Sequence, residues 1–187
     1  MTPIDNRIFV LILQHPQEQD KQLGTAQLAR LQLKQSLLKV GLSWPGLRRI
    51  LGREVDPARW GVLFLGTART AAAAATSEEI LLLDRKGQPV AGQREALRGL
   101  EGIILLDGNW SQAKALWWRN PWLLKLRRIL LQPKHGSLYG SLRKEPRAES
   151  LSTIEAAAFC LARLERQPEL EAAILAPFNR LLAKYRG

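Results

Sequence analysis

Short apolar runs recur along this chain, and longer segments with helical periodicity separate them. The apolar runs lie within residues 7–13, 60–66, 78–84, 102–108 and 126–133. Each contains a continuous series of Val, Ile, Leu or Phe without the polar alternation of a half-exposed strand. Such runs are typical of strands that are buried on both faces of a sheet. We therefore predict five strands over these ranges.

Helical patterns fill the intervals between these strands. Leu28, Leu31 and Leu38 predict a mainly helical segment over residues 24–41, which Gly41 ends. The other predicted helices cover residues 95–102, 110–119, 151–166 and 168–186. Strands that alternate with helices predict an α/β fold with a mostly parallel sheet flanked by helices on both faces.

The composition limits the kinds of site that the chain can carry. Cys160 is the only cysteine, which excludes an intramolecular disulfide and a multi-cysteine metal site. His15 and His135 do not have the spacing of a zinc signature. The apolar run at residues 8–13 is too short for a signal peptide core or a membrane span. We expect one cytoplasmic domain over residues 1–187, without a metal or a membrane partner.

The charge of the chain is strongly positive, at +11. Between Lys114 and Arg147, nine Lys or Arg residues stand against a single acid, Glu145, and Trp and Tyr are interleaved with them. Basic and aromatic residues in this combination favour binding to nucleic acid. The alternative is a solvated surface that happens to be basic.

Polar turns follow two of the predicted strands and precede a predicted helix. These turns are "LGTA" (65–68), "DGNW" (107–110) and "LSTIEA" (151–156). Ligands of parallel sheets bind beyond the carboxyl ends of the strands, so we expect the three turns to meet at one edge of the sheet. Asp107 is the candidate functional carboxylate. Its alternative role is to cap the helix that follows, but Asn109 and Ser111 can also do this.

The aromatic and hydroxyl residues near these turns have simpler interpretations as well. Trp110 either stacks on a ligand or packs in the core, whereas Trp117 and Trp118 are most simply interpreted as core. Ser152 or Thr153 either caps a helix or binds an anionic group at its N-terminus.

Taken in order, four stretches of the chain resemble the motifs of a known family. They are "LILQHPQE", "GTA", "LLDGNWSQAKALWWRNPWL" and "YGSLRKEPRAESLSTIEA", within residues 7–160. They resemble the DTW-domain proteins, which are tRNA-uridine aminocarboxypropyltransferases. The motif that gives this family its name is aspartate–x–threonine–tryptophan, which corresponds to residues 107–110. This chain has Asn109 where the threonine is usual. The N-terminal cysteine cluster of many members is missing here, so no structural zinc is expected.

The resemblance implies a fold, a donor and a substrate. The fold would be SPOUT-like, with a C-terminal knot around the cofactor. The donor would be S-adenosylmethionine, and its 3-amino-3-carboxypropyl group would pass to N3 of a uridine in tRNA, releasing methylthioadenosine. The alternatives are a SPOUT-type RNA methyltransferase and a non-catalytic RNA-binding protein. We expect a monomer, although the sequence leaves the oligomeric state open.

The resemblance also implies roles for individual residues. Asp107 would be the catalytic base that takes the proton from uridine N3. The residues expected to bind the cofactor are Leu65, Gly66, Leu106, Gly108, Trp110, Leu151, Ser152 and Thr153. The residues expected to bind RNA are His15, Lys114, Arg143, Lys144 and Arg147.

Overall fold

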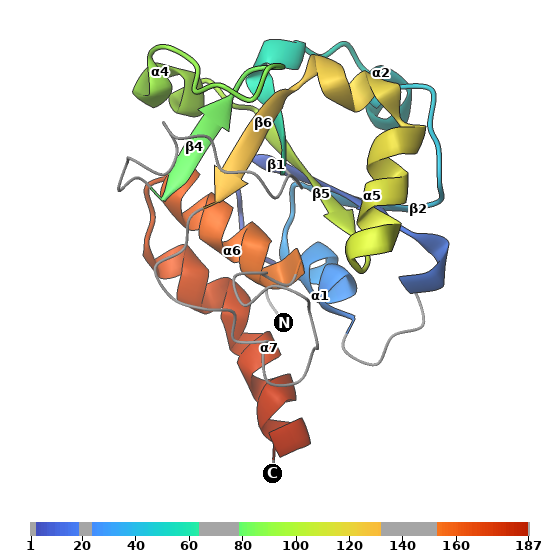
Figure 1. Cartoon of the computed structure of the whole chain (residues 1–187). Helices are drawn as coiled ribbons and strands as arrows, with labels where there is room; N and C mark the ends of the chain where they lie inside the picture. The colour runs from blue at the N-terminus through green and yellow to red at the C-terminus, as the bar shows by residue number, and fades with distance from the viewer. Residues whose placement is uncertain (1–2, 19–23, 64–78, 132–152, 187) are drawn as a thin grey trace.

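The chain folds around a six-stranded sheet with the strand order β2-β1-β5-β3-β6-β4 (Figure 1). The structure, a computed structural model, describes residues 3–18, 24–63, 79–131 and 153–186. The strands are β1 (Phe9–Gln14), β2 (Ser36–Val40), β3 (Trp60–Leu63), β4 (Ile80–Leu83), β5 (Gly102–Asp107) and β6 (Arg127–Leu131). Every neighbouring pair is parallel except β4 and β6. The predicted α/β fold with a mostly parallel sheet is confirmed.

Helices follow β1, β2, β4 and β5 along the chain, and the segments after β3 and β6 lie outside the described residues. The helices are α1 (Thr25–Gln32), α2 (Leu47–Leu51), α4 (Gln93–Arg98), α5 (Trp110–Arg119), α6 (Thr153–Leu164) and α7 (Glu169–Arg186). The described ranges also contain three short 3-10 helices, η1 (Pro16–Glu18), η2 (Pro57–Arg59) and η3 (Pro121–Lys125). The five predicted strands correspond to β1, β3, β4, β5 and β6. The predicted helix over 110–119 has the same bounds as α5.

The prediction of a mainly helical segment over residues 24–41 is wrong in its second half. Helix α1 ends at Gln32, and β2 follows as an edge strand that pairs in parallel with β1. The hydroxyl of Ser36 donates to the carbonyl oxygen of Leu33 at 2.7 Å, which supports the turn between the two elements. Pairing with the exposed edge of β1 outweighs the helical spacing of the leucines, because tertiary context overrides a weak local preference.

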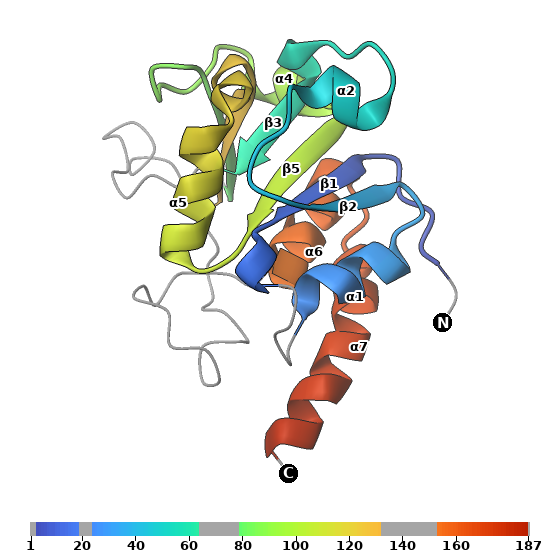
Figure 2. The ribbon, with the colours of Figure 1, turned by 90° about the vertical axis from the view of Figure 1, so that its right-hand side faces the viewer.

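Two large hydrophobic cores lie on the two faces of the sheet, and a small third cluster joins β4 to β6. Side chains alternate along β1, so that Val10 and Ile12 belong to one core and Leu11 and Leu13 to the other. Helices α1, α6 and α7 cover the first face, and α2, α5 and η3 cover the second (Figure 2). The predicted burial of the sheet between two layers of helices is therefore confirmed.

Residues 132–152, which connect β6 to α6, lie outside the described residues. The C-terminal knot therefore stays a prediction. In the described ranges, no helix combines the length and the apolar character that a bilayer crossing requires. Nor do those ranges contain a cluster of three His, Cys, Asp or Glu side chains arranged to hold a metal ion.

The thiol of Cys160 lies in the middle of α6 and is fully buried. Burial raises the pKa of this thiol to about 12, against a smaller lowering by the charge of Arg163. Because the thiolate is the reactive form, the folded protein should be inert to a disulfide reagent below pH 9, the ordinary pKa of the group. The denatured chain should react at once.

The same pKa difference gives a pH dependence of stability. The unfolded chain ionises this thiol first, so the contribution of Cys160 to the free energy of unfolding is constant below pH 9 and falls as the pH rises from 9 towards 12. The reactivity of Cys160 is measured from the absorbance of the product that the disulfide reagent releases, with and without denaturant. Rapid labelling of the native protein would contradict the burial of Cys160.

Candidate active site

The carboxylate of Asp107 lies at the carboxyl end of β5 and contacts two other segments of the chain. Gln14 is its register partner on β1, and the Nε2 of Gln14 donates to Oδ2 of Asp107 at 2.9 Å. Thr153, the first residue of α6, donates its hydroxyl to Oδ1. Asp107 is 6% exposed. Three segments that are distant in sequence therefore converge on one buried carboxylate.

The side-chain alternation of β5 explains why Asp107 meets α6. Ile103 and Leu105 point to the face that α1, α6 and α7 cover, and Asp107 is the next residue in that series. The N-terminus of α6 therefore faces this carboxylate. A helix N-terminus has a positive partial charge, so it stabilises a negative group in this place.

The ends of β1 and β5 form the point at which the crossover connections of the sheet diverge. After β1, the chain passes through α1 on the first face to reach β2 at one edge. After β5, it passes through α5 on the second face to reach β6 in the opposite direction. Ligands of open parallel sheets bind in the crevice at such a switch point. Asp107 and Gln14 are the last residues of these two strands.

Asn109, not Asp107, caps the helix that follows. Oδ1 of Asn109 accepts from the backbone N–H of Gln112 at 2.9 Å, and Oε1 of Gln112 accepts from the backbone N–H of Asn109 at 2.8 Å. This reciprocal capping box leaves Asp107 available for another role, as the sequence indicates. Threonine is also a good N-cap residue, so asparagine in this place of the family motif preserves the start of α5.

Gly108 allows the turn after β5 to pass close to its neighbours. Its φ is +154°, and a Cβ there would lie 2.7 Å from the Cβ of Gln112 and 3.5 Å from the Cβ of His15. A larger residue would therefore push against both the capping box and the loop after β1.

His15 is fixed next to this turn. Its backbone N–H donates to the carbonyl oxygen of Asp107 at 3.0 Å, and its Nδ1 accepts from the backbone N–H of Gln17 at 3.2 Å. In a neutral ring this arrangement places the proton on Nε2. His15 thus lies beside the Asp107 turn, and its contact to RNA stays a prediction.

The other predicted site residues divide into those that the structure places and those outside the described ranges. Leu106 packs in the second core with Leu116, so only its backbone faces the strand end. Trp110 is half-buried in the first turn of α5, and Lys114 is exposed one turn later. The residues outside the described ranges are Leu65, Gly66, Arg143, Lys144, Arg147, Leu151 and Ser152. Their roles, and the convergence of the "LGTA" turn, stay predictions.

Sequence reasoning missed Gln14 as a member of this site. The available signal was a polar residue at the end of the buried run "FVLILQ". The interpretation of Trp118 as core is wrong, because this ring is 68% exposed. Trp117 does pack against the second core, and the guanidinium carbon of Arg128 lies 5.4 Å from its ring centroid.

Comparison with known proteins identifies the family. The DTW domain model matches residues 1–186. The chain is similar to tRNA-uridine aminocarboxypropyltransferase 2 of Drosophila melanogaster, with 33% identity over 179 residues that cover 95% of this chain and 64% of that protein. It is also similar to the protein of the same name from Macaca fascicularis, with 30% identity over 185 residues that cover 96% and 55% of the two chains.

This chain therefore spans between 55% and 64% of the length of these two relatives. No solved structure matches it significantly. The family match over nearly the whole chain agrees with the motifs and with the Asp107 turn that they form. The chain belongs to the DTW-domain family.

Proposed function

We propose that this chain transfers the 3-amino-3-carboxypropyl group of S-adenosylmethionine to N3 of a uridine in tRNA and releases methylthioadenosine. The observation that carries the proposal is the buried carboxylate of Asp107, held by Gln14 and Thr153 at the switch point of the sheet. The names of the relatives, tRNA-uridine aminocarboxypropyltransferases, support the reaction class.

The charges of the site suit this donor. S-adenosylmethionine carries a sulfonium cation and an amino acid group with both charges. The site offers a buried carboxylate at Asp107 and, facing it, the positive end of α6, which favours a carboxylate ligand. We assign the amino-acid arm to Ser152 and Thr153 and the rest of the donor to the strand-end residues Leu65, Gly66, Leu106, Gly108, Trp110 and Leu151.

When bound, the donor supplies a carbon that the adjacent sulfonium already activates. The protein therefore needs no covalent nucleophile, which agrees with Cys160 being buried away from the site in the core of α6. What the chain must supply is orientation and a place for one proton.

Asp107 is the proposed acceptor of that proton. The imide nitrogen of uridine is a poor nucleophile until it loses its proton, and a positioned general base contributes about 10²- to 10⁴-fold to the rate. Each carboxylate oxygen of Asp107 accepts one hydrogen bond, from Gln14 or Thr153, and so retains a free acceptor site. Gln14 and Thr153 fix the direction in which those sites point.

The acceptor uridine must leave its base stack to reach a carboxylate that is 6% exposed. Trp110, at the start of α5, is the proposed aromatic contact for the unstacked base. The proposed contacts to tRNA are His15, Lys114, Arg143, Lys144 and Arg147. Several cationic contacts of this kind make affinity fall steeply with salt.

The test is an assay of purified protein with tRNA and donor that is labelled in the aminocarboxypropyl group. The expected products are methylthioadenosine and a labelled uridine, identified by nucleoside mass spectrometry. Release of S-adenosylhomocysteine instead would show methyl transfer and overturn the proposal. Binding of tRNA with neither product, and without calorimetric binding of the donor, would show a non-catalytic RNA-binding protein.

A further inference from the structure

The outer side of α5 carries an aromatic ring that the fold does not use. Helix α5 packs on the sheet through Ala113 and Leu116, whereas Lys114 and Trp118, one turn apart, are exposed. Trp118 is 68% exposed, although Trp117 beside it packs in the second core. Trp118 lies eight residues after Trp110, which is about 12 Å along the helix from the Asp107 turn.

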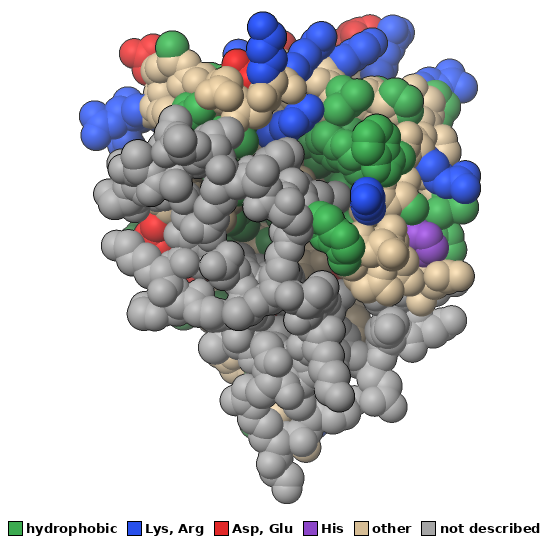
Figure 3. All heavy atoms as spheres, viewed as in Figure 1, with side chains coloured by type: hydrophobic (Ala, Val, Ile, Leu, Met, Phe, Trp, Pro, Cys, Tyr) green, Lys and Arg blue, Asp and Glu red, His purple; other side chains and the backbone are tan. Residues whose placement is uncertain are grey.

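More apolar surface surrounds this ring. Leu124 of η3 is 40% exposed. Hydrophobic side chains gather on the surface over α5 and η3, and Lys and Arg side chains border them (Figure 3). A bulky ring with so much exposed area is typical of a contact site, because burying it against a partner removes apolar surface from water.

The charge around Trp118 is of one sign. Between residues 110 and 131 there is no acid, and the five basic residues are Lys114, Arg119, Lys125, Arg127 and Arg128. Lys114, Arg119 and Lys125 form no ion pair with any described residue, so no described acid neutralises their charge. Such a surface is complementary to a polyanion.

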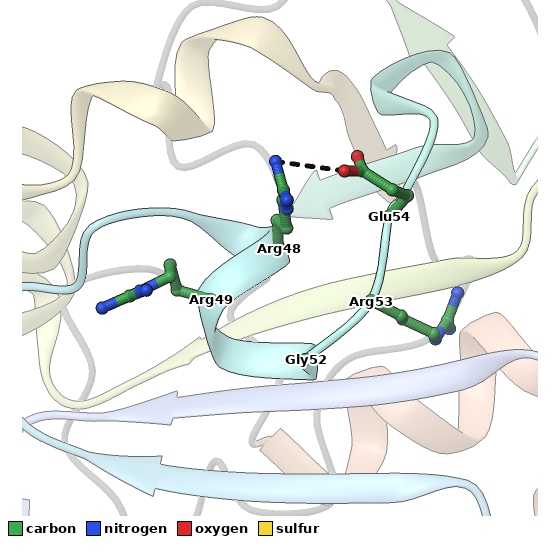
Figure 4. A pocket seen from close by; sticks show the side chains of 5 residues that line it. All are labelled: Arg48, Arg49, Gly52, Arg53 and Glu54. Atoms are coloured by element: carbon green, nitrogen blue, oxygen red, sulfur yellow. Dashed lines mark ion pairs between the residues drawn. The ribbon is translucent and has the colours of Figure 1, made fainter.

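Helix α2 extends this basic surface. Arg48, Arg49, Arg53 and Glu54 line a shallow pocket at the end of α2 (Figure 4). Arg48 pairs with Glu54 at 3.0 Å, and both side chains are largely exposed. Arg49 and Arg53 point away from that pair on opposite sides, and neither has an ion-pair partner in the described part of the chain.

The loop before α2 attaches it to the end of α5. The backbone N–H of Trp44 donates to Oδ1 of Asn120 at 2.9 Å, and the hydroxyl of Ser43 donates to the carbonyl oxygen of Arg119 at 3.3 Å. The two helices therefore belong to one layer. The α5–α2 face is defined here by Lys114, Trp118, Arg119, Arg48 and Arg49.

The opposite layer lacks this charge. In α1, α6, α7 and the turn between α6 and α7, residues 25–32 and 153–186, six basic residues stand against four acids. Its largest described apolar exposure is Leu31 of α1, at 62%, an aliphatic side chain that offers no ring for a base to stack on. A polyanion with exposed bases is therefore expected on the α5–α2 face and not on the α6–α7 layer.

We propose that the α5–α2 face is the surface on which RNA docks, with Trp118 stacked on an unpaired base and the surrounding cations on phosphates. This docking face rests on the proposed function, because we take the docked RNA to be the substrate of the Asp107 site. Because α5 begins at that site and ends beside Trp118, RNA held on this face is directed along the helix towards Asp107.

The two kinds of contact predict two different signatures in tRNA binding, measured by fluorescence anisotropy without donor over a series of salt concentrations. Trp118→Ala should weaken binding about five- to 150-fold, as expected for loss of one stacked base, without changing the salt dependence. Arg49→Gln combined with Arg119→Gln should flatten the slope of log K against log salt by about 1.4, since each lost single-strand phosphate contact removes about 0.7.

Matched controls lie on the opposite layer. Leu31→Ala removes an apolar side chain of similar exposure, and Arg180→Gln with Lys184→Gln removes two exposed charges from α7. Both variants should bind tRNA as the parent does. Unchanged affinity in Trp118→Ala, or an equal loss in Leu31→Ala, would overturn the docking face. So would a Trp118 effect on binding to phosphatidylserine–phosphatidylcholine vesicles with none on tRNA.

Release of methylthioadenosine, measured separately, distinguishes this inference from the proposed function. A protein whose tRNA affinity depends on Trp118 but which releases no methylthioadenosine would refute the reaction and keep the docking face. A protein that turns over with tRNA affinity independent of Trp118 would refute the docking face and keep the reaction.

Discussion

Asp107→Asn should reduce the turnover of methylthioadenosine release by about 10²- to 10⁴-fold, the usual contribution of a general base. The amide has the shape of the carboxylate but cannot accept the proton of uridine N3. Donor binding should persist, because we assign the arm of the donor to the start of α6. Single-turnover kinetics with tRNA, together with calorimetry of the donor alone, measures the two effects separately.

The hydrogen bonds around Asp107 determine the controls for this variant. The new amide retains an acceptor for either Thr153 or Gln14, and Gln14 can rotate its own amide to face the new donor, so a loss of about 1 kcal/mol of stability is expected. Thr153→Val keeps the carboxylate and removes one orienting bond, together with a hydroxyl that we assign to the amino-acid arm of the donor. It should lower turnover less than Asp107→Asn does.

Two outcomes would reassign the residue. Full turnover in Asp107→Asn would remove it as the base. Loss of donor binding in parallel with turnover would show that the carboxylate contacts the donor, in the same pocket to which we assign Thr153.

The sequence predicts the central strands well because they are buried on both faces. A strand such as β5 has six buried residues in succession, and few other structures require so continuous an apolar run. Strand β2 escapes prediction because it is an edge strand whose burial decreases along its length, and its leucines also fit a helix. β2 forms because it pairs with the edge of β1, and a pairing between segments distant in the chain is not visible in the local sequence.

The same distinction applies to the site. Asp107 and Thr153 are visible in the sequence because each stands at the end of a regular element. Gln14 is not, because its contact with Asp107 follows from the register of β1 on β5, which joins positions 93 residues apart. Adjacent residues of a helix point about 100° apart, so Trp117 and Trp118 do not both face the core. The buried series through Ala113 and Leu116 identifies Trp118 as the outer one.

Asn120→Ala should lower the free energy of unfolding by about 3–5 kcal/mol, because its side chain satisfies several buried groups at once. Asn120 is 0% exposed. Its Nδ2 donates to the carbonyl oxygens of Leu42 and Leu116 at 3.0 and 2.7 Å. Its Oδ1 accepts from the backbone N–H of Trp44 at 2.9 Å and from Nε1 of Trp122 at 3.2 Å.

Most of these partners lose their hydrogen bond in the variant, whereas Nε1 of Trp122 keeps its bond to the carbonyl oxygen of Trp44 at 3.0 Å. Urea denaturation should show a lower midpoint with an unchanged slope. Ser43→Ala, which removes only an exposed 3.3 Å bond to Arg119 at the same junction, should cost less than about 0.5 kcal/mol. A loss below about 1 kcal/mol in Asn120→Ala would mean that water replaces the amide. The attachment of α2 to α5 would then not depend on this side chain.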